Sequence, residues 1–226
     1  MSAPVAPPPT SAWSMYRALV GIAAFCGLAV VLVFQATRPV IAKNRAEALE
    51  RAIFDVVPGS ATSRAFRLLD DGRFAPATAD GKSGPVVHAA YADDGGLAGL
   101  AIEGRGMGYQ DTIAVLWGYS PALEAIVGLR VLESRETPGL GDKIETDPAF
   151  RANFERLDVA LAADGTALAH PIQAVAHGKK ERPWQVDGIT GATISSKAIG
   201  KLLGESAAFW LPRIRPRLAD FEAGGK

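Results

Sequence analysis

Residues 187–197 read DGITGATISSK and lead into a segment with helical spacing that runs to about Leu211. The first N–H groups of a helix lack partners within the helix, and together with the helix dipole they favour an anion such as a phosphate. The small residues Gly191 and Ala192 leave room for a bulky group beside this helix start. The segment therefore has the features of a phosphate-binding site.

Polar side chains of this segment admit two interpretations. In a functional one, the Thr193 hydroxyl takes a phosphoester bond and the Lys197 ammonium offsets the negative phosphate. In a purely structural one, Thr193 or Ser195 is the N-cap of the helix and the small residues only form a turn. Residue types and spacing alone leave both interpretations open.

A second segment, ETPGLGDKI at residues 136–144, directly follows a predicted strand. Its Pro-Gly pair sets a turn. Thr137 offers a hydroxyl group, and Leu140 is an apolar side chain in a loop. An apolar side chain beside polar donors suits the edge of a flat aromatic ligand. From its residues alone, the segment is equally consistent with a plain connecting turn.

A glycine-rich stretch, GRGMGY at residues 104–109, is expected to form a loop. It is not a dinucleotide-binding fingerprint, because that motif requires a strand, a tight turn and a helix in order. Residues 112–119 have the pattern of another strand instead. We expect a bend here, or a close approach of neighbouring chain segments.

The pattern between residues 59 and 215 favours strands joined by hairpins, with helices at the edges. Segments rich in apolar and β-branched residues alternate with turn signals such as DDGG at residues 93–96. This arrangement predicts an α+β fold and not a doubly wound sheet. Strands are expected at 66–69, 86–91, 97–103, 112–119, 125–133 and 173–176, and helices at 42–57, 148–157 and 195–211.

The N-terminal part contains a charge-free apolar run, Ala18–Thr37. A helix rises about 1.5 Å per residue, so this run is long enough to cross the roughly 30 Å hydrocarbon core of a bilayer. Its end is a poor signal-peptidase site, so we expect an uncleaved single span. Four basic residues between 38 and 51 follow the run, against Arg17 before it. This count by itself favours a cytoplasmic C-terminal side.

The composition argues against several other functions. Among 226 residues, 24 are Lys or Arg and 24 are Asp or Glu, so no basic surface for nucleic acid is indicated. The single cysteine, Cys26, cannot form an internal disulfide, a four-thiolate iron–sulfur site or a zinc finger. The histidines at 88, 170 and 177 lack the spacing of metal ligands. We expect neither a metal site nor binding to nucleic acid.

The stretch DGITGAT, Asp187–Thr193, resembles the flavinylation motif of the FMN-binding domain family, in which Asp and two further residues precede Ser/Thr-Gly-Ala-Ser/Thr. In that family the last Thr or Ser receives FMN through a phosphoester bond. FAD is the donor, and a Mg-dependent FAD:protein FMN transferase catalyses the transfer. The resemblance therefore implies covalent FMN on Thr193 and not on Thr190.

The ETPGLGDKI stretch resembles the loop that members of this family place against the flavin. The order of an N-terminal span, a stalk, a glycine-rich segment, a PGLG loop and a GAT motif also matches most of the chain. The resemblance implies one FMN-binding domain with an antiparallel sheet and flanking helices. Besides Thr193, it implies flavin contacts by Glu136, Thr137, Leu140, Gly141, Asp187, Thr190, Gly191, Ala192 and Lys197.

The expected organisation has five parts, of which the FMN-binding domain is the largest. They are a disordered lead (1–16), a transmembrane helix (17–37), a stalk helix (38–58), the FMN-binding domain (59–215) and a loose, charged C-terminal tail (216–226).

Within the family, the motifs and the short chain are most similar to the G subunits of Rnf-type ion-translocating ferredoxin:NAD oxidoreductase complexes. The resemblance implies an electron relay in the bacterial inner membrane, with the flavin domain on the periplasmic side despite the charge count. The other membrane subunits would be its partners, and it would not be catalytic alone.

Other functions remain open from the sequence. The C subunits of sodium-pumping NADH:quinone reductases share the domain. A flavin-binding redox sensor and a structural subunit in which DGITGAT only caps a helix are further alternatives. A soluble reductase is disfavoured by the apolar N-terminal run.

Overall fold

The protein is described by a computed structural model that covers residues 12–77 and 84–222. The chain divides into two compact units, Met1–Glu47 and Ala48–Lys226.

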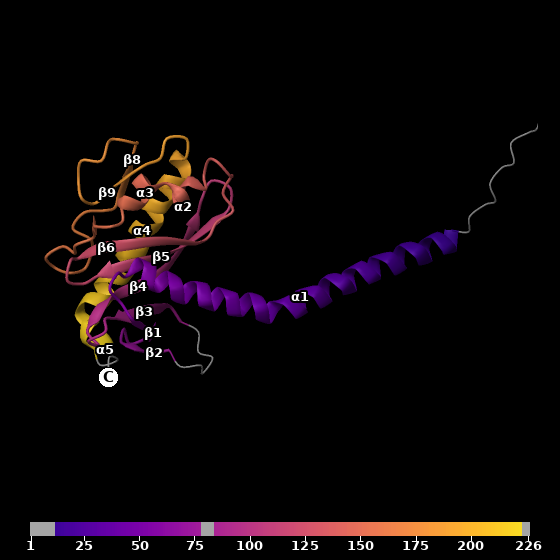
Figure 1. Ribbon diagram of the computed structural model, residues 1–226, viewed down its shortest axis with the longest axis horizontal. Helices are drawn as coiled ribbons and strands as arrows, with labels where there is room; N and C mark the ends of the chain where they lie inside the picture. Colours follow the sequence, from indigo (N-terminus) through magenta and orange to yellow (C-terminus); the bar gives the residue numbers. More distant parts are fainter. Residues whose placement is uncertain (1–11, 78–83, 223–226) are drawn as a thin grey trace, which may run out of the picture. The chain divides into compact units, whose positions relative to one another are not determined.

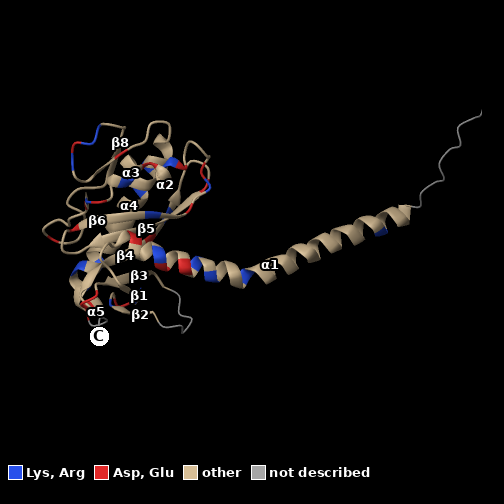
Figure 2. Cartoon of the chain, in the orientation of Figure 1, with Lys and Arg blue, Asp and Glu red and all other residues tan. Residues whose placement is uncertain are grey.

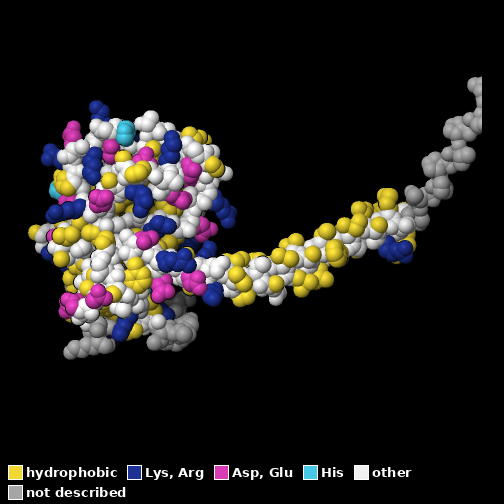
Figure 3. Space-filling view, in the orientation of Figure 1, with side chains coloured by type: hydrophobic (Ala, Val, Ile, Leu, Met, Phe, Trp, Pro, Cys, Tyr) yellow, Lys and Arg dark blue, Asp and Glu magenta, His cyan; other side chains and the backbone are white. Residues whose placement is uncertain are grey.

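The N-terminal helix α1 (Ala12–Val56) is a single element of 45 residues that continues through Pro39. Among the described residues it is the one helix long and apolar enough to cross a membrane. Its large apolar side chains between Trp13 and Ile41 are exposed. Figure 2 shows few charges over this part of α1, and Figure 3 shows it covered by hydrophobic side chains.

One continuous helix occupies the part of the chain where a transmembrane helix and a stalk helix are expected from the sequence. The stretches 17–37 and 38–58, assigned to a transmembrane helix and a stalk, lie within or at the end of the one helix α1. The expected lead extends to residue 16, but residues 12–16 already belong to α1, and the earlier ones lie outside the described residues.

A seven-stranded antiparallel sheet forms the centre of the second unit, in the order β2-β1-β3-β4-β5-β6-β7 (Figure 1). The antiparallel α+β fold predicted from the sequence is confirmed. The strands are β1 (Thr62–Leu68), β2 (Phe74–Pro76), β3 (Val86–Tyr91), β4 (Leu97–Met107), β5 (Thr112–Ser120), β6 (Ala125–Glu133) and β7 (Leu157–Asp158).

Both faces of this sheet are covered, as the burial of the inner strand β5 shows. Every residue of β5 after Thr112 is buried. Val115 and Trp117 face the main hydrophobic core, whereas Leu116 between them packs with Ile53 and Val56 from the end of α1. This alternation follows from the two-residue period of a strand.

The helix α4 (Thr193–Ile214) belongs to the main core and contacts β4. The glycine-rich stretch 104–109, expected to be a loop, is strand as far as Met107. The β4–β5 ladder continues to the Met107–Thr112 pair. A Cβ at Gly104 would lie 2.6 Å from Leu202 Cδ2 of α4, so the missing side chains let the helix approach the strand. The expected close approach is therefore present, but within a strand.

Smaller elements complete the second unit. The helix expected at 148–157 is shorter, because Asn153 ends α3 and residues 157 and 158 pair with β6 instead. The strand expected at 173–176 is β8, which pairs in parallel with β9. These elements are α2 (Lys143–Thr146), α3 (Pro148–Ala152), β8 (Gln173–Val175) and β9 (Gln185–Asp187).

The expected loose C-terminal tail is wrong for the described residues up to 222. After α4, the chain continues as η1 (Arg215–Arg217) and α5 (Leu218–Glu222). Phe221 is fully buried beside Phe66 and Phe74. The Tyr91 hydroxyl donates a hydrogen bond to the Phe221 carbonyl oxygen (2.7 Å). An apolar side chain among charged neighbours therefore fixes this segment to the sheet.

Gly118 of β5 provides a test of how closely α1 packs on the sheet. A Cβ at this position would lie 1.8 Å from the Val56 carbonyl oxygen, so Gly118→Ala forces the two elements apart. We expect a loss of about 1–3 kcal/mol in the free energy of unfolding, measured by urea unfolding of the full chain in detergent. Gly204→Ala is the matched control, because its Cβ would meet nothing nearer than 3.7 Å. Equal unfolding midpoints for the two variants would contradict the packing described here.

Candidate functional site

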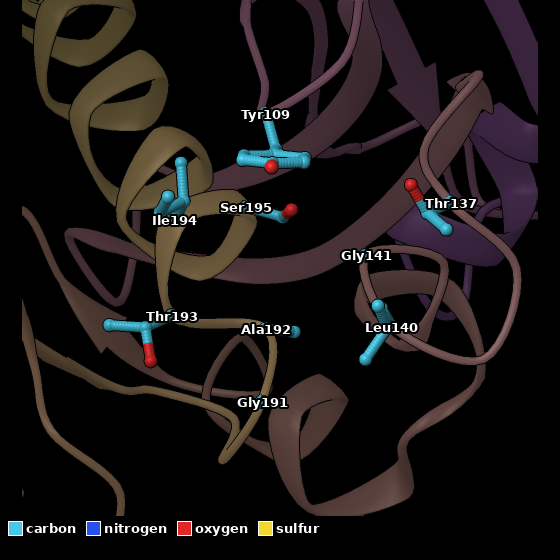
Figure 4. A pocket seen from close by; sticks show the side chains of 9 residues that line it. All are labelled: Tyr109, Thr137, Leu140, Gly141, Gly191, Ala192, Thr193, Ile194 and Ser195. Atoms are coloured by element: carbon cyan, nitrogen blue, oxygen red, sulfur yellow. The ribbon is translucent and has the colours of Figure 1, made fainter.

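Three chain segments form a pocket of about 360 Å³ on the second unit (Figure 4). One segment follows β4, one follows β6, and one starts α4. The lining residues are Tyr109, Thr137, Leu140, Gly141, Gly191, Ala192, Thr193, Ile194 and Ser195. The two motifs singled out in the sequence thus lie side by side, although they are far apart in the chain.

The turn before α4 is held by hydrogen bonds that do not involve Thr193. Gly191 has a φ of +84°, a conformation that side-chain-bearing residues rarely adopt. The buried Ser196 hydroxyl donates to the Ala192 carbonyl oxygen (2.8 Å) and accepts from the Ile189 N–H (3.1 Å). These bonds close the turn on its inner side.

Thr193 is the first residue of α4 and is exposed. Its hydroxyl makes no hydrogen bond to any described residue. The N-cap residue is Ala192, whose side chain cannot cap the helix. The structural interpretation in which Thr193 or Ser195 is the N-cap is therefore wrong, because neither side chain occupies that position.

A buried carboxylate, Glu136, joins the three segments behind the pocket. Its oxygens accept hydrogen bonds from the Gln110 N–H (2.9 Å), the Tyr109 N–H (3.2 Å) and the Ser195 hydroxyl. Burial alone would raise the pKa of Glu136, but the Ser195 hydroxyl and the backbone N–H groups outweigh it and lower this pKa below its ordinary value of 4.5. Glu136 is therefore a carboxylate at neutral pH.

The rim of the pocket is apolar and exposed. Tyr109, Leu140 and Ile194 have exposed fractions of 66%, 51% and 56%. Such values are high for large apolar side chains beside a cavity, and they suit contact with a flat ligand. The Thr137 hydroxyl donates to Gln110 Oε1 (3.0 Å), which ties the loop after β6 to the loop after β4.

The structure brings together only part of the predicted site. Thr137, Leu140, Gly141, Gly191, Ala192 and Thr193 line the pocket, whereas Glu136, Asp187, Thr190 and Lys197 do not. Asp187 lies in β9, where its carboxylate accepts from the N–H groups of Gly178 (3.0 Å) and Lys179 (3.3 Å). Thr190 and Lys197 are exposed.

Sequence reasoning missed three residues that line the pocket: Tyr109, Ile194 and Ser195. Tyr109 had a usable signal, because an aromatic residue directly after a glycine-rich stretch suits a ligand contact. Ile194 and Ser195 directly follow the flavinylation motif, and only the helical turn brings them to the pocket.

All three pocket segments lie within residues 108–207, which match the FMN-binding domain family. The class of protein is therefore an FMN-binding domain protein with a long apolar N-terminal helix.

Similar proteins of known name show to which family within this class the chain belongs. The G subunit of the ion-translocating oxidoreductase complex of Methanosarcina acetivorans is 30% identical over 186 residues, which are 80% of this chain and 85% of that protein. The G subunit of the same complex from Cereibacter sphaeroides is 32% identical over 173 residues, covering 76% and 72% of the two chains. The chain belongs to the family of these G subunits.

A solved structure supports the fold. The crystal structure of the C subunit of the Na(+)-translocating NADH-quinone reductase from Parabacteroides distasonis superposes with a TM-score of 0.60. It covers 76% of this chain and 94% of the other at 18% sequence identity. The resemblance to an antiparallel FMN-binding domain fold, inferred from the motifs, is thus confirmed.

The lowered pKa of Glu136 predicts how stability depends on pH. Because the folded-state pKa lies below the unfolded value near 4.5, the carboxylate contributes its full stabilisation well above pH 4.5. This contribution is lost as the pH falls from about 4.5 through the lowered pKa. We expect wild type to be more stable than Glu136→Gln at pH 7, with a margin that shrinks below pH 4.5. Urea unfolding by tryptophan fluorescence at several pH values measures the margin, and a pH-independent margin would refute the assignment.

Proposed function

We propose that the chain is an electron-relaying flavoprotein subunit of an ion-translocating ferredoxin:NAD oxidoreductase complex, with FMN covalently attached to Thr193. The observation that carries this proposal is the position of Thr193. Thr193 is exposed, its hydroxyl makes no hydrogen bond to described residues, and it lies at a helix start on the rim of a pocket with apolar walls.

The helix start fits a phosphate. The N–H groups in the first turn of α4 have no partners within the helix, and Ala192 provides no side-chain cap that would compete for them. The positive end of the helix dipole favours the single negative charge of a phosphodiester. Lys197, one turn further along α4, adds a positive charge on the exposed side of the helix.

The pocket walls fit a flat aromatic ring system. Tyr109, Leu140 and Ile194 supply apolar surface, and backbone groups around Gly141 and Gly191 supply polar contacts. The volume of about 360 Å³ is at the lower end of small-molecule sites, so part of the ligand stays accessible from outside. An accessible edge suits electron exchange with another protein.

The bound flavin supplies the electron chemistry, and the protein supplies position and environment. None of the nine described residues that line the pocket is a carboxylate, a histidine, a lysine or an arginine. Tyr109, Thr137 and Leu140 would hold and orient the ring, and these lining residues supply no acid–base pair.

Attachment requires a second protein, a Mg-dependent FAD:protein FMN transferase. The Thr193 oxygen forms a bond to the FMN phosphorus of FAD, the pyrophosphate bond breaks, and AMP leaves. The hydroxyl proton goes to a base of the transferase, because no carboxylate or imidazole of this chain among the described residues hydrogen-bonds to Thr193. No electron is exchanged in this step.

The apolar part of α1 would anchor the domain in the bacterial inner membrane, with the flavin domain on the periplasmic side. A tethered cofactor is not lost there, where free FMN is scarce. The relatives named as subunits of ion-translocating complexes support other membrane subunits as electron donor and acceptor.

Replacement of the acceptor hydroxyl tests the attachment. We expect Thr193→Ala, coexpressed with the transferase, to lose the fluorescent band in a denaturing gel under ultraviolet light, because the phosphoester has no oxygen to form on. Thr190→Ala is the matched control, since this exposed threonine lies three residues away and does not line the pocket. It should keep the band. A band that survives Thr193→Ala, or disappears only with Thr190→Ala, would overturn the site.

A further inference from the structure

The buried carboxylate of Glu136 is enclosed by positions that carry no side chain. A Cβ at Gly108 would lie 2.5 Å from Glu136 Oε1, and a Cβ at Gly141 would lie 2.6 Å from Oε2. Side chains at either position would displace the carboxylate from its donors. Glycine at both positions therefore lets the chain wrap closely around this one group.

Glu136 has no direct access to the flavin site. The Glu136 residue is 6% exposed and does not line the pocket. Its oxygens are occupied by the Ser195 hydroxyl and by two backbone N–H groups from the loop after β4. Its direct hydrogen bond to the helix that begins at Thr193 comes from the Ser195 hydroxyl.

Helical geometry links Ser195 to Thr193. Successive residues of a helix are rotated by about 100°, so two positions along the helix the side chain points to nearly the opposite side. Ser195 is 2% exposed and points to the carboxylate, whereas Thr193 is exposed. A hydrogen bond that holds Ser195 on the buried side of the helix therefore holds Thr193 on its exposed side.

We propose that the Glu136 carboxylate and the Ser195 hydroxyl form a latch that fixes the first turn of α4 and so presents the Thr193 hydroxyl for flavin transfer. This inference rests on the proposed function. Glu136 and Ser195 are positioning residues in it. The latch also fixes the pocket wall, because it joins the loop that carries Tyr109 to the helix start that carries Ile194.

Amide hydrogen exchange on the flavin-free full chain in detergent tests the latch without any cofactor. We expect Ser195→Ala to raise exchange about tenfold over residues 108–111 and 189–196, because one charge-assisted bond between these segments is lost. Ser206→Ala is the matched control. It removes a hydroxyl of the same helix that accepts a bond from Trp117 Nε1 (3.1 Å), away from the pocket. It should leave exchange in both segments unchanged.

Flavin transfer to the same variants tests whether the latch presents the Thr193 hydroxyl to the transferase. With purified transferase, FAD and Mg²⁺, we expect kcat/KM per folded chain to fall about tenfold for Ser195→Ala and Glu136→Gln. Ser206→Ala should stay close to wild type. A role limited to stability would lower only the amount of folded chain, not the kcat/KM of the folded part.

The outcomes separate this inference from the proposed function. Unchanged exchange in Ser195→Ala, or a kcat/KM loss shared equally by Ser206→Ala, overturns the latch while leaving flavin at Thr193 intact. If the wild-type chain takes up no flavin, or Thr193→Ala is still labelled, the proposed function fails. The exchange comparison then still decides whether the carboxylate holds the helix start.

Discussion

The carboxylate of Glu136 is the constraint on which the site depends, because burying a charge costs free energy unless hydrogen bonds compensate for the lost water. Its donors lie 26 and 27 residues before it and 59 residues after it in the chain. These distant segments must therefore reach their final positions together. The energetic penalty for an unpaired carboxylate couples the loop after β4, the loop after β6 and the start of α4, which are the three segments that form the pocket.

The rest of the second unit brings these segments to one place. Antiparallel pairing of β4, β5 and β6 sets the loops after β4 and β6 near each other, since β4 and β6 both lie beside β5 and run in the same direction. The bare backbone at Gly104 and Gly106 then lets α4 approach β4, with Leu202 filling the space. The start of α4 therefore lies beside the two loops and lines the same pocket. The pocket is a consequence of how the helix packs on the sheet.

Much of this architecture was predictable from local sequence, and the failures have a common cause. The strands 86–91 and 125–133 agree with the observed limits, because their apolar residues and flanking turns are local signals. The loop expected at 104–109 and the loose tail were wrong, because their partners, Leu202 and Tyr91, are distant in sequence. The same limit applies to the site. Both sequence motifs contain residues that line the pocket, but the buried position of Glu136 and the exposure of Tyr109 depend on contacts with distant segments.

The openness of the pocket explains why a tether would be useful. Tyr109, Leu140 and Ile194 leave much of their surface exposed, so a ligand against them would bury limited apolar area and gain limited hydrophobic stabilisation. A deeper pocket would hold the flavin without a covalent bond, but it would also separate the ring from electron-transfer partners. The proposed phosphoester at Thr193 would remove this conflict, because attachment would keep the effective concentration of the ring at its pocket high whatever the affinity. Retention of the flavin would then depend on the first turn of α4, and its contact with the protein would depend on the apolar rim.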